Sequence, residues 1–125
     1  MNSVLVVDDE DDARKLLARY LEKLGYNVRQ APSGKAALSE IINHQPDVVI
    51  LDLMMPDMDG PSLLEVVRAY LRLESLPVVV LSAIEDGPLI ARVPSARVND
   101  ILIKSKAKLE HIKAAVEQAL CRLPS

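Results

Sequence analysis

The chain has 125 residues, of which 50% are hydrophobic and 26% are charged, and this fits one globular domain with no room for a second. A net charge of -3 and an aromatic content of 2% predict no direct binding of nucleic acid, since both a basic surface and stacking rings are missing. One cysteine, Cys121, cannot form an internal disulfide, and with two scattered histidines it cannot build a structural zinc site.

The first predicted strand, Val4–Val7, follows the N-terminus directly. No basic region, long apolar segment or cleavage signature comes before it. We therefore expect neither secretion nor insertion into a membrane, and a location in the cytoplasm.

Five short apolar runs predict β-strands, and three of them are continuously apolar and rich in β-branched residues. Strands buried on both faces of a parallel sheet have this composition. In chain order, the runs are Val4–Val7, Asn27–Ala31, Val48–Leu51, Val78–Leu81 and Ile101–Ile103.

Segments of helical period lie between these strands. Gly25 follows the first segment, where a helix C-terminus favours a left-handed residue. Ser33 is predicted to cap a second helix, and Pro61 to occupy the first position of a third. The apolar stripes of the first and last helices are expected to be Ala13, Leu16, Leu17, Tyr20, Leu21 and Leu24, and Leu109, Ile112, Val116, Leu120 and Leu123.

The segment before the fifth strand is the exception. Gly87, Pro88 and Pro94 leave only Leu89–Val93 for a helix, so a short or irregular one is expected. Strand and helix still alternate along the whole chain. This alternation predicts an α/β fold, a doubly wound parallel sheet with helices on both faces, because parallel strands need right-handed crossovers.

Polar residues follow the predicted strands at their carboxyl ends, where open α/β sheets form their sites. Asp8 and Asp9 follow the first strand and Asp52 the third. Ser82 and Lys104 follow the fourth and fifth strands. Three carboxylates about 4 Å apart would repel by about 4 kcal/mol per pair at an effective dielectric constant of 20, so a counter-charge is needed.

A divalent cation would supply that charge. Mg²⁺ prefers one or two carboxylates, several waters and phosphate oxygens. Asp52 is then a candidate nucleophile, because carboxylates can form aspartyl phosphates. The hydroxyl of Ser82 and the ammonium of Lys104 are predicted to hold phosphoryl oxygens.

These residues stand in motifs that resemble the receiver domain of two-component response regulators, over the whole of residues 1–125. The motifs are VLVVDDE, DVVILDLMMPDMDG, VVVLSA and LIK. The resemblance implies a five-stranded sheet in the order 2-1-3-4-5. It also implies Asp52 as phosphoacceptor, Ser82 and Lys104 as its catalytic partners, and Asp8, Asp9, Asp52 and the backbone carbonyl of Met54 as ligands of Mg²⁺, or of Mn²⁺ in its place.

The function that the resemblance implies is a phosphorylation-activated signalling switch. A sensor histidine kinase or phosphotransfer protein would donate the phosphoryl group, and binding to a downstream output domain or protein would change. The chain would catalyse its own phosphorylation and slow self-dephosphorylation, and would not be a turnover enzyme on a separate substrate. Dimerisation, the cognate kinase and whether the chain stands alone are left open by the sequence.

The sequence departs from the family at two switch positions. Ile101 stands where the family has Tyr or Phe, and Ser105 follows Lys104 where proline is common. A cis bond before a non-proline residue costs about 2.5 to 4 kcal/mol, so we predict a trans Lys104–Ser105 bond. Met54 and Ile84, both apolar, occupy positions that affect hydrolysis in the family, and we expect them to slow loss of the phosphoryl group.

Three other functions fit the sequence less well. A phosphohydrolase of the haloacid dehalogenase type would carry a second Asp where Met54 stands. A flavodoxin-like cofactor binder would need a Ser/Thr/Gly-rich loop in place of the acidic run Asp8–Asp12. An inert interaction module is disfavoured because the five candidate polar residues are all present, although Ile101 leaves open a switch that transmits differently.

Overall fold

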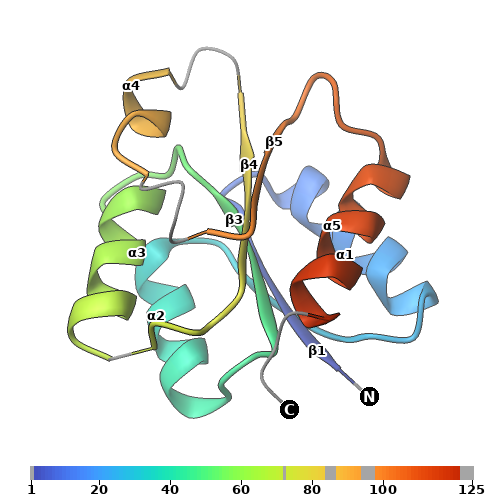
Figure 1. The fold of residues 1–125 in the computed structure, drawn as a ribbon, viewed down its shortest axis with the longest axis horizontal. Helices are drawn as coiled ribbons and strands as arrows, with labels where there is room; N and C mark the ends of the chain where they lie inside the picture. Colours follow the sequence, from blue (N-terminus) through green and yellow to red (C-terminus); the bar gives the residue numbers. More distant parts are fainter. Residues whose placement is uncertain (1, 72, 84–86, 94–97, 122–125) are drawn as a thin grey trace.

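A computed structural model describes residues 2–71, 73–83, 87–93 and 98–121. They form one parallel sheet in the order β2-β1-β3-β4-β5. The strands are β1 (Ser3–Val7), β2 (Asn27–Ala31), β3 (Val48–Asp52), β4 (Val78–Ser82) and β5 (Asp100–Ile103). In Figure 1, helices α1 and α5 cover one face of the sheet, and α2 and α3 cover the other. The predicted fold class and strand order are confirmed.

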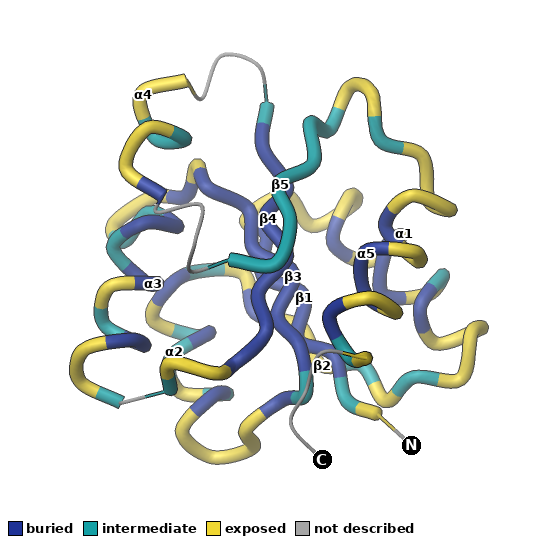
Figure 2. Tube along the Cα trace, viewed as in Figure 1, coloured by how far each residue is buried: buried dark blue, intermediate teal, exposed yellow. Residues whose placement is uncertain are grey.

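The three inner strands β1, β3 and β4 form the centre of the core, and every residue of β3 and β4 is buried. Figure 2 shows this buried centre between the two helical layers. Successive side chains point to opposite faces, so Val4 and Val6 pack toward α1 and α5 while Leu5 and Val7 pack toward α2 and α3. Two cores, one on each face, therefore hold the sheet rigid.

Helix α1 (Asp11–Lys23) is confirmed, but its predicted buried face is partly wrong. Leu16 is 63% exposed and Leu24 38% exposed, and Ala13 is exposed too. The predicted stripe spans a wide arc of the helix, and only part of it faces the sheet. The residues that are buried along α1 are Arg14, Leu17, Ala18 and Leu21.

The predicted start of α2 (Gly34–Asn43) is confirmed, and α3 (Gly60–Ala69) begins one residue before Pro61, its predicted first position. The Ser33 hydroxyl accepts a hydrogen bond from the backbone N–H of Ala36, and Pro61 lies in the first turn of α3. The side chain of Asp59 caps α3 by accepting from the N–H of Ser62. These caps hold both helix starts close to the carboxyl edge of the sheet.

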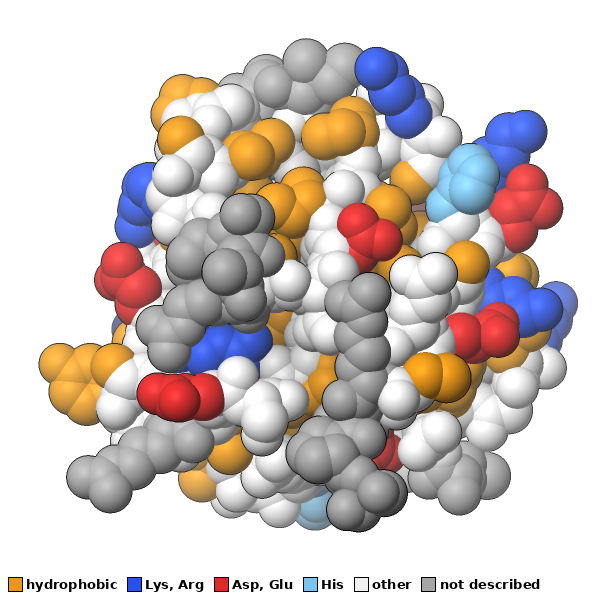
Figure 3. Space-filling model, viewed as in Figure 1, with side chains coloured by type: hydrophobic (Ala, Val, Ile, Leu, Met, Phe, Trp, Pro, Cys, Tyr) orange, Lys and Arg blue, Asp and Glu red, His pale blue; other side chains and the backbone are white. Residues whose placement is uncertain are grey.

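The chain between β4 and β5 contains the short helix α4 (Gly87–Ile90). A short helix is confirmed, but the predicted bounds Leu89–Val93 are wrong, because the helix includes Gly87 and Pro88, and proline is tolerated in a first turn. Pro94 and Ile84 lie outside the described residues. Strand β5 is half-buried at every residue, and hydrophobic side chains gather on the face between α4 and β5 in Figure 3. Ile101, at the position of the family aromatic, packs against the core on the side of α2 and α3.

Helix α5 (Leu109–Cys121) closes the described part of the chain. Ile112 and Val116 are buried as predicted, Leu109 is 38% exposed, and Leu123 lies outside the described residues. Over the described residues no peptide bond is cis, so the predicted trans bond after Lys104 is confirmed. None of the described helices is both long and apolar enough to span a membrane.

Candidate functional site

The register of the sheet brings Asp8 and Asp52 to neighbouring positions at its carboxyl edge. Val7 pairs with Leu51, and the next residue in each strand direction is an acid, Asp8 after Val7 and Asp52 after Leu51. Asp52 is the last residue of β3, and Asp8 directly follows β1, where its N–H still donates to the carbonyl of Ala31. Both acids are buried, at 6% and 5% exposure for Asp8 and Asp52. Rigid strands therefore hold both carboxylates.

Asp9 completes an acidic cluster with Asp8 and Asp52. One carboxylate oxygen from each of the three residues lies within 4.8 Å of the others. Asp9 is exposed, whereas the carboxylate of Asp8 is also fixed by the N–H of Glu10 at 2.9 Å. The convergence that the sequence predicted is thus present, with one of the three acids open to solvent.

Lys104 bridges the two buried acids. Its Nζ lies 3.3 Å from Oδ2 of Asp8 and 3.3 Å from Oδ1 of Asp52. Burial lowers the pKa of this ammonium, but the charges of Asp52 and Asp8 outweigh that effect, and the net pKa is raised. Lys104 therefore keeps its positive charge between the two carboxylates. Three carboxylates against one ammonium still leave excess negative charge.

The pKa of Asp52 is raised to about 7. Burial is the largest cause, and the negative charges of Asp8 and Asp9 add to it, while Lys104 acts in the opposite direction. An acid with this pKa is protonated in a large fraction of the molecules near neutral pH, and the protonated form is a poor nucleophile until a further cation favours ionisation. The electrostatics of the cluster therefore favour a bound cation.

Ser82 is the last residue of β4 and is fully buried, with 0% exposure. Its hydroxyl donates to the carbonyl of Ala83 at 3.0 Å. The backbone joins Ser82 to the lysine, because the N–H of Lys104 donates to the Ser82 carbonyl at 2.8 Å. The predicted pair of Ser82 and Lys104 thus comes from adjacent strands.

Met54 lies in the loop between β3 and α3, and its side chain is 53% exposed. Among the described residues no backbone N–H donates to the Met54 carbonyl from the loops, and its role as a metal ligand stays a prediction. The loop is held by a hydrogen bond from the N–H of Gly60 to the carbonyl of Leu53 at 2.8 Å. Asp57 takes a left-handed conformation at its tip, with φ of 67°. The loop thus returns tightly onto the end of β3.

The donor set suits Mg²⁺. At Mg–O distances of about 2.1 Å, octahedral ligand oxygens lie about 3 Å apart when adjacent and about 4 Å apart when opposite. The carboxylate oxygens of Asp8, Asp9 and Asp52 all lie within 4.8 Å of one another, so modest side-chain shifts would bring them to the spacing of ligands around one cation. All three donors are hard oxygens, and the open side of Asp9 leaves room for water ligands.

Arg14 is a site residue that the sequence analysis missed. It is 7% exposed, and one of its nitrogens, Nη1, donates to the backbone carbonyl of Asp8 at 3.0 Å. The signal was present in the sequence, because Arg14 lies three residues before Leu17 and seven before Leu21, on the buried face of α1. A charged residue on such a face needs buried partners.

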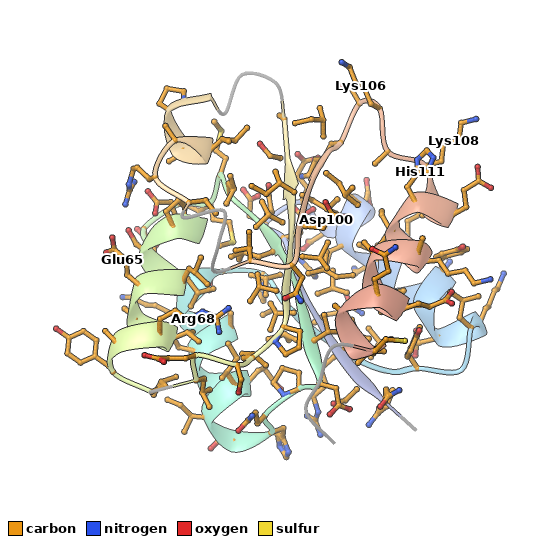
Figure 4. The ribbon with its side chains drawn as sticks, in the orientation of Figure 1. Glu65, Arg68, Asp100, Lys106, Lys108 and His111 are labelled. Atoms are coloured by element: carbon orange, nitrogen blue, oxygen red, sulfur yellow. The ribbon has the colours of Figure 1, made fainter. Side chains whose placement is uncertain are left out.

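The other lysines of this region stay on the surface. Figure 4 shows Lys106 and Lys108 extending outward from the loop between β5 and α5, and both are exposed. The backbone N–H of Lys108 donates to Nδ1 of His111, which closes the first turn of α5. Lys104 is therefore the lysine of this loop that reaches the acidic cluster.

A parallel α/β sheet of this order, with three acids, a serine and a lysine at one edge, defines the receiver class of signalling domains. The family model of the response regulator receiver domain matches residues 4–117, and the chain belongs to this family. The predicted function, a phosphorylation-activated signalling switch, is confirmed at the level of the family.

Named relatives agree. The chain is 38% identical over 121 residues to the transcriptional regulatory protein KdpE of Mycobacterium tuberculosis, covering 94% of this chain and 52% of the relative. It is 37% identical over 84 residues to the transcriptional regulatory protein GltR of Pseudomonas aeruginosa, covering 67% of this chain and 35% of that protein. The receiver domain of NtrX from Brucella abortus superposes with a TM-score of 0.82 at 30% identity, covering 96% and 99% of the two chains.

The chain therefore spans about a third to a half of the length of these two transcriptional regulators. Their names fit the prediction of a regulator rather than a turnover enzyme. The functions of the parts of those regulators that this chain does not match belong to those proteins.

Proposed function

We propose that the chain is a switch that accepts a phosphoryl group on Asp52 in a Mg²⁺-dependent reaction and thereby changes which partner it binds. The observation that carries the proposal is the convergence of Asp8, Asp9 and Asp52, with Lys104 bridging two of these acids at 3.3 Å. Membership of the receiver family supports it.

Asp52 is the proposed nucleophile because it ends a fully buried strand, so its carboxylate is held at the sheet edge. One of its oxygens attacks phosphorus of a phosphohistidine on a sensor kinase or phosphotransfer protein. The new bond is O–P, and the imidazole leaves with the electron pair of the broken P–N bond. A small phosphodonor can replace the phosphohistidine in the same step.

Mg²⁺ held by Asp8, Asp9, Asp52 and the carbonyl of Met54 would neutralise the charge that the carboxylates share with the phosphoryl oxygens. Lys104 would exchange its contact with Asp52 for a phosphoryl oxygen, and the hydroxyl of Ser82 would donate to another. Ser82 ends β4, the neighbour of β3, and Lys104 follows β5 with its Nζ already 3.3 Å from Asp52, so little movement is needed. Water would later remove the phosphoryl group slowly, which is the self-dephosphorylation expected from the sequence.

The output is a change in partner binding. A phosphoryl group adds charge at the edge where the loop between β3 and α3 and the segment with α4 meet the sheet, and such charge can bias a two-state surface. The proposed downstream partner is an output domain or a separate protein. Location in the cytoplasm stays a prediction, and dimerisation stays open.

Incubation of the protein with acetyl phosphate and Mg²⁺, followed by intact mass measurement, tests the proposal. We expect the wild type to gain the mass of one phosphoryl group and Asp52→Asn to gain none. Asp57→Asn is the matched control, because Asp57 is an exposed acid in the same loop and Asn tolerates its left-handed backbone. It should be phosphorylated like the wild type.

A wild type that binds Mg²⁺ but gains no mass would contradict the proposal and favour an inert interaction module. Equal phosphorylation of the wild type and Asp52→Asn would place the acceptor elsewhere. Addition of a chelator should stop the reaction, since the proposed transfer depends on the cation.

A further inference from the structure

The buried guanidinium of Arg14 lies behind the acidic cluster and uses its three nitrogens on three different partners. Nη1 donates to the carbonyl of Asp8 at 3.0 Å, and Nε donates to Oε1 of Gln30 at 3.1 Å. Nη2 forms an ion pair with Asp11 at 2.7 Å. The side chain thus ties together the start of α1, strand β2 and the residue that follows β1.

The contact with Asp8 matters because of where β1 ends. The N–H of Asp8 still pairs with Ala31 of β2, but the ladder stops there and the chain turns away into α1. The Asp8 carbonyl therefore has no strand partner on that side, and Arg14 supplies a donor in its place. An unmet buried carbonyl would cost free energy and let the turn shift.

We propose that Arg14 is a positioning residue for the metal site: by holding the backbone carbonyl of Asp8, it sets the place from which the carboxylate of Asp8 binds a divalent cation. The inference rests on the proposed function, because it concerns the same acidic cluster. Arg14 touches no candidate ligand oxygen directly. It acts through the backbone of one ligand, as outer partners of metal ligands commonly do.

The positioning effect of Arg14 and the effect of its positive charge change the affinity for Mg²⁺ in opposite directions, so the two can be separated by experiment. A guanidinium near a cation site repels the cation, so deleting only its charge would tighten Mg²⁺ binding. Deleting its hold on Asp8 would weaken Mg²⁺ binding instead. The sign of the change in affinity therefore separates the two roles.

The test is the dissociation constant of Mg²⁺ by calorimetric titration, measured on the wild type and on Arg14→Met at a temperature where circular dichroism shows both folded. We expect about tenfold weaker binding in Arg14→Met, the size typical of lost outer-shell contacts. Lys15→Met is the matched control, because Lys15 is an exposed cation on the same helix without a contact to Asp8. It should bind Mg²⁺ as tightly as the wild type or slightly more tightly.

Two further variants keep the test valid if Arg14→Met does not fold. Arg14→Lys keeps the charge but cannot hold three acceptors in the fixed geometry of a guanidinium, so its affinity should fall between those of the wild type and Arg14→Met. Gln30→Ala removes a partner of Arg14 without touching Asp8, and a smaller weakening is expected.

Unchanged or tighter Mg²⁺ binding in a folded Arg14→Met, or in Arg14→Lys and Gln30→Ala together, would overturn the positioning role alone. Absence of Mg²⁺ binding in the wild type would instead overturn the metal site of the proposed function, and this inference with it. Melting temperatures without Mg²⁺ give the purely structural effect of each variant. Because affinity is measured where each variant is folded, weaker Mg²⁺ binding by Arg14→Met reports the position of Asp8 and not the loss of global stability.

Discussion

Single residues of the site could be predicted where the backbone alone determines their place. Asp8, Asp52, Ser82 and Lys104 each end or follow a parallel strand, so topology brings them to one edge. Arg14 could not be predicted in the same way, because its partner is a backbone carbonyl whose direction depends on how the chain turns after β1. Predicting a contact of this kind, from a side chain to a backbone carbonyl, requires the three-dimensional structure.

The structure defines the surroundings of the Met54 side chain more closely than the sequence does. Its side chain is 53% exposed beside the site, so it is not packed in the core. We expect an exposed apolar side chain there to hinder the approach of the hydrolytic water. Met54→Asn should therefore shorten the lifetime of the phosphorylated protein several-fold with little change in stability.

The decay of the phosphorylated protein after removal of the phosphodonor, followed by intact mass, checks this prediction. Leu16→Asn is a matched control, because Leu16 is an exposed apolar residue of similar size on α1. Decay of Met54→Asn at the wild-type rate would show that this side chain does not control hydrolysis.

At the scale of elements, the positions where helices start were more predictable than the faces that they bury. Ser33 and Pro61 act locally, through a cap and a fixed φ; the cap is confirmed, and α3 begins within one residue of the predicted position. The buried face of α1 depends instead on how the helix lies against the sheet and α5, and Leu16 was wrongly placed inside. Tyr70 directly follows the last residue of α3 and is 82% exposed, so it too lies outside the core.

Gly60 begins α3 and packs closely against Leu53 and the backbone of Asp52 at the end of β3. A Cβ added there would lie 2.8 Å from Cα and Cδ2 of Leu53 and 3.0 Å from the carbonyl oxygen of Asp52. The obstacle is backbone as well as side chain, so it cannot simply turn away. We predict that Gly60→Ala lowers the free energy of unfolding by about 1 to 3 kcal/mol.

Urea unfolding of Gly60→Ala and Gly87→Ala checks this prediction. Gly87 is the matched control, because a Cβ there would meet no atom within 4 Å and the residue begins α4. Gly87→Ala should be neutral or slightly stabilising, since alanine restricts the unfolded chain more than glycine does. Equal stability of the two variants would show that the loop relaxes to make room at Gly60.

At the scale of the whole molecule, the sheet order and the two helical layers followed from the alternation of strand and helix together with the family resemblance. Periodicity alone could not give the order, because many parallel arrangements satisfy it. The region of α4 and β5 was only partly predictable. Its proline and glycine residues indicated a short helix, but the half-exposed β5 is a consequence of tertiary packing.

The buried acid Asp52 should make the stability of the whole metal-free protein depend on pH. Its folded pKa of about 7 lies above the unfolded value, so the folded state binds the proton more tightly. This contribution to stability is fully present below about pH 4 and is lost as the pH rises through about 7. Lys104 is charged in both states over this range and adds no slope.

Asp59 behaves in the opposite way, since its pKa is lowered: burial would raise it, but the hydrogen bonds from Ser62 and the nearby Arg92 prevail. Its contribution is present above about pH 4 and is lost below that value. Between about pH 5 and pH 8, Asp52 should therefore dominate among these three groups, and the stability of the metal-free protein should fall as the pH rises.

Asp52→Asn should remove most of this slope and make the metal-free protein more stable near pH 8, by on the order of a few kcal/mol at most. The gain is limited because the variant also loses the contact of Asp52 with Lys104, although Lys104 keeps its partner Asp8. Urea unfolding in chelator across the pH range measures both effects, with Asp57→Asn as the exposed control. The same slope in Asp52→Asn as in the wild type would show that another group carries the pH dependence. Because Mg²⁺ binds the ionised acid, adding it should oppose the loss at high pH in the wild type and do little for Asp52→Asn.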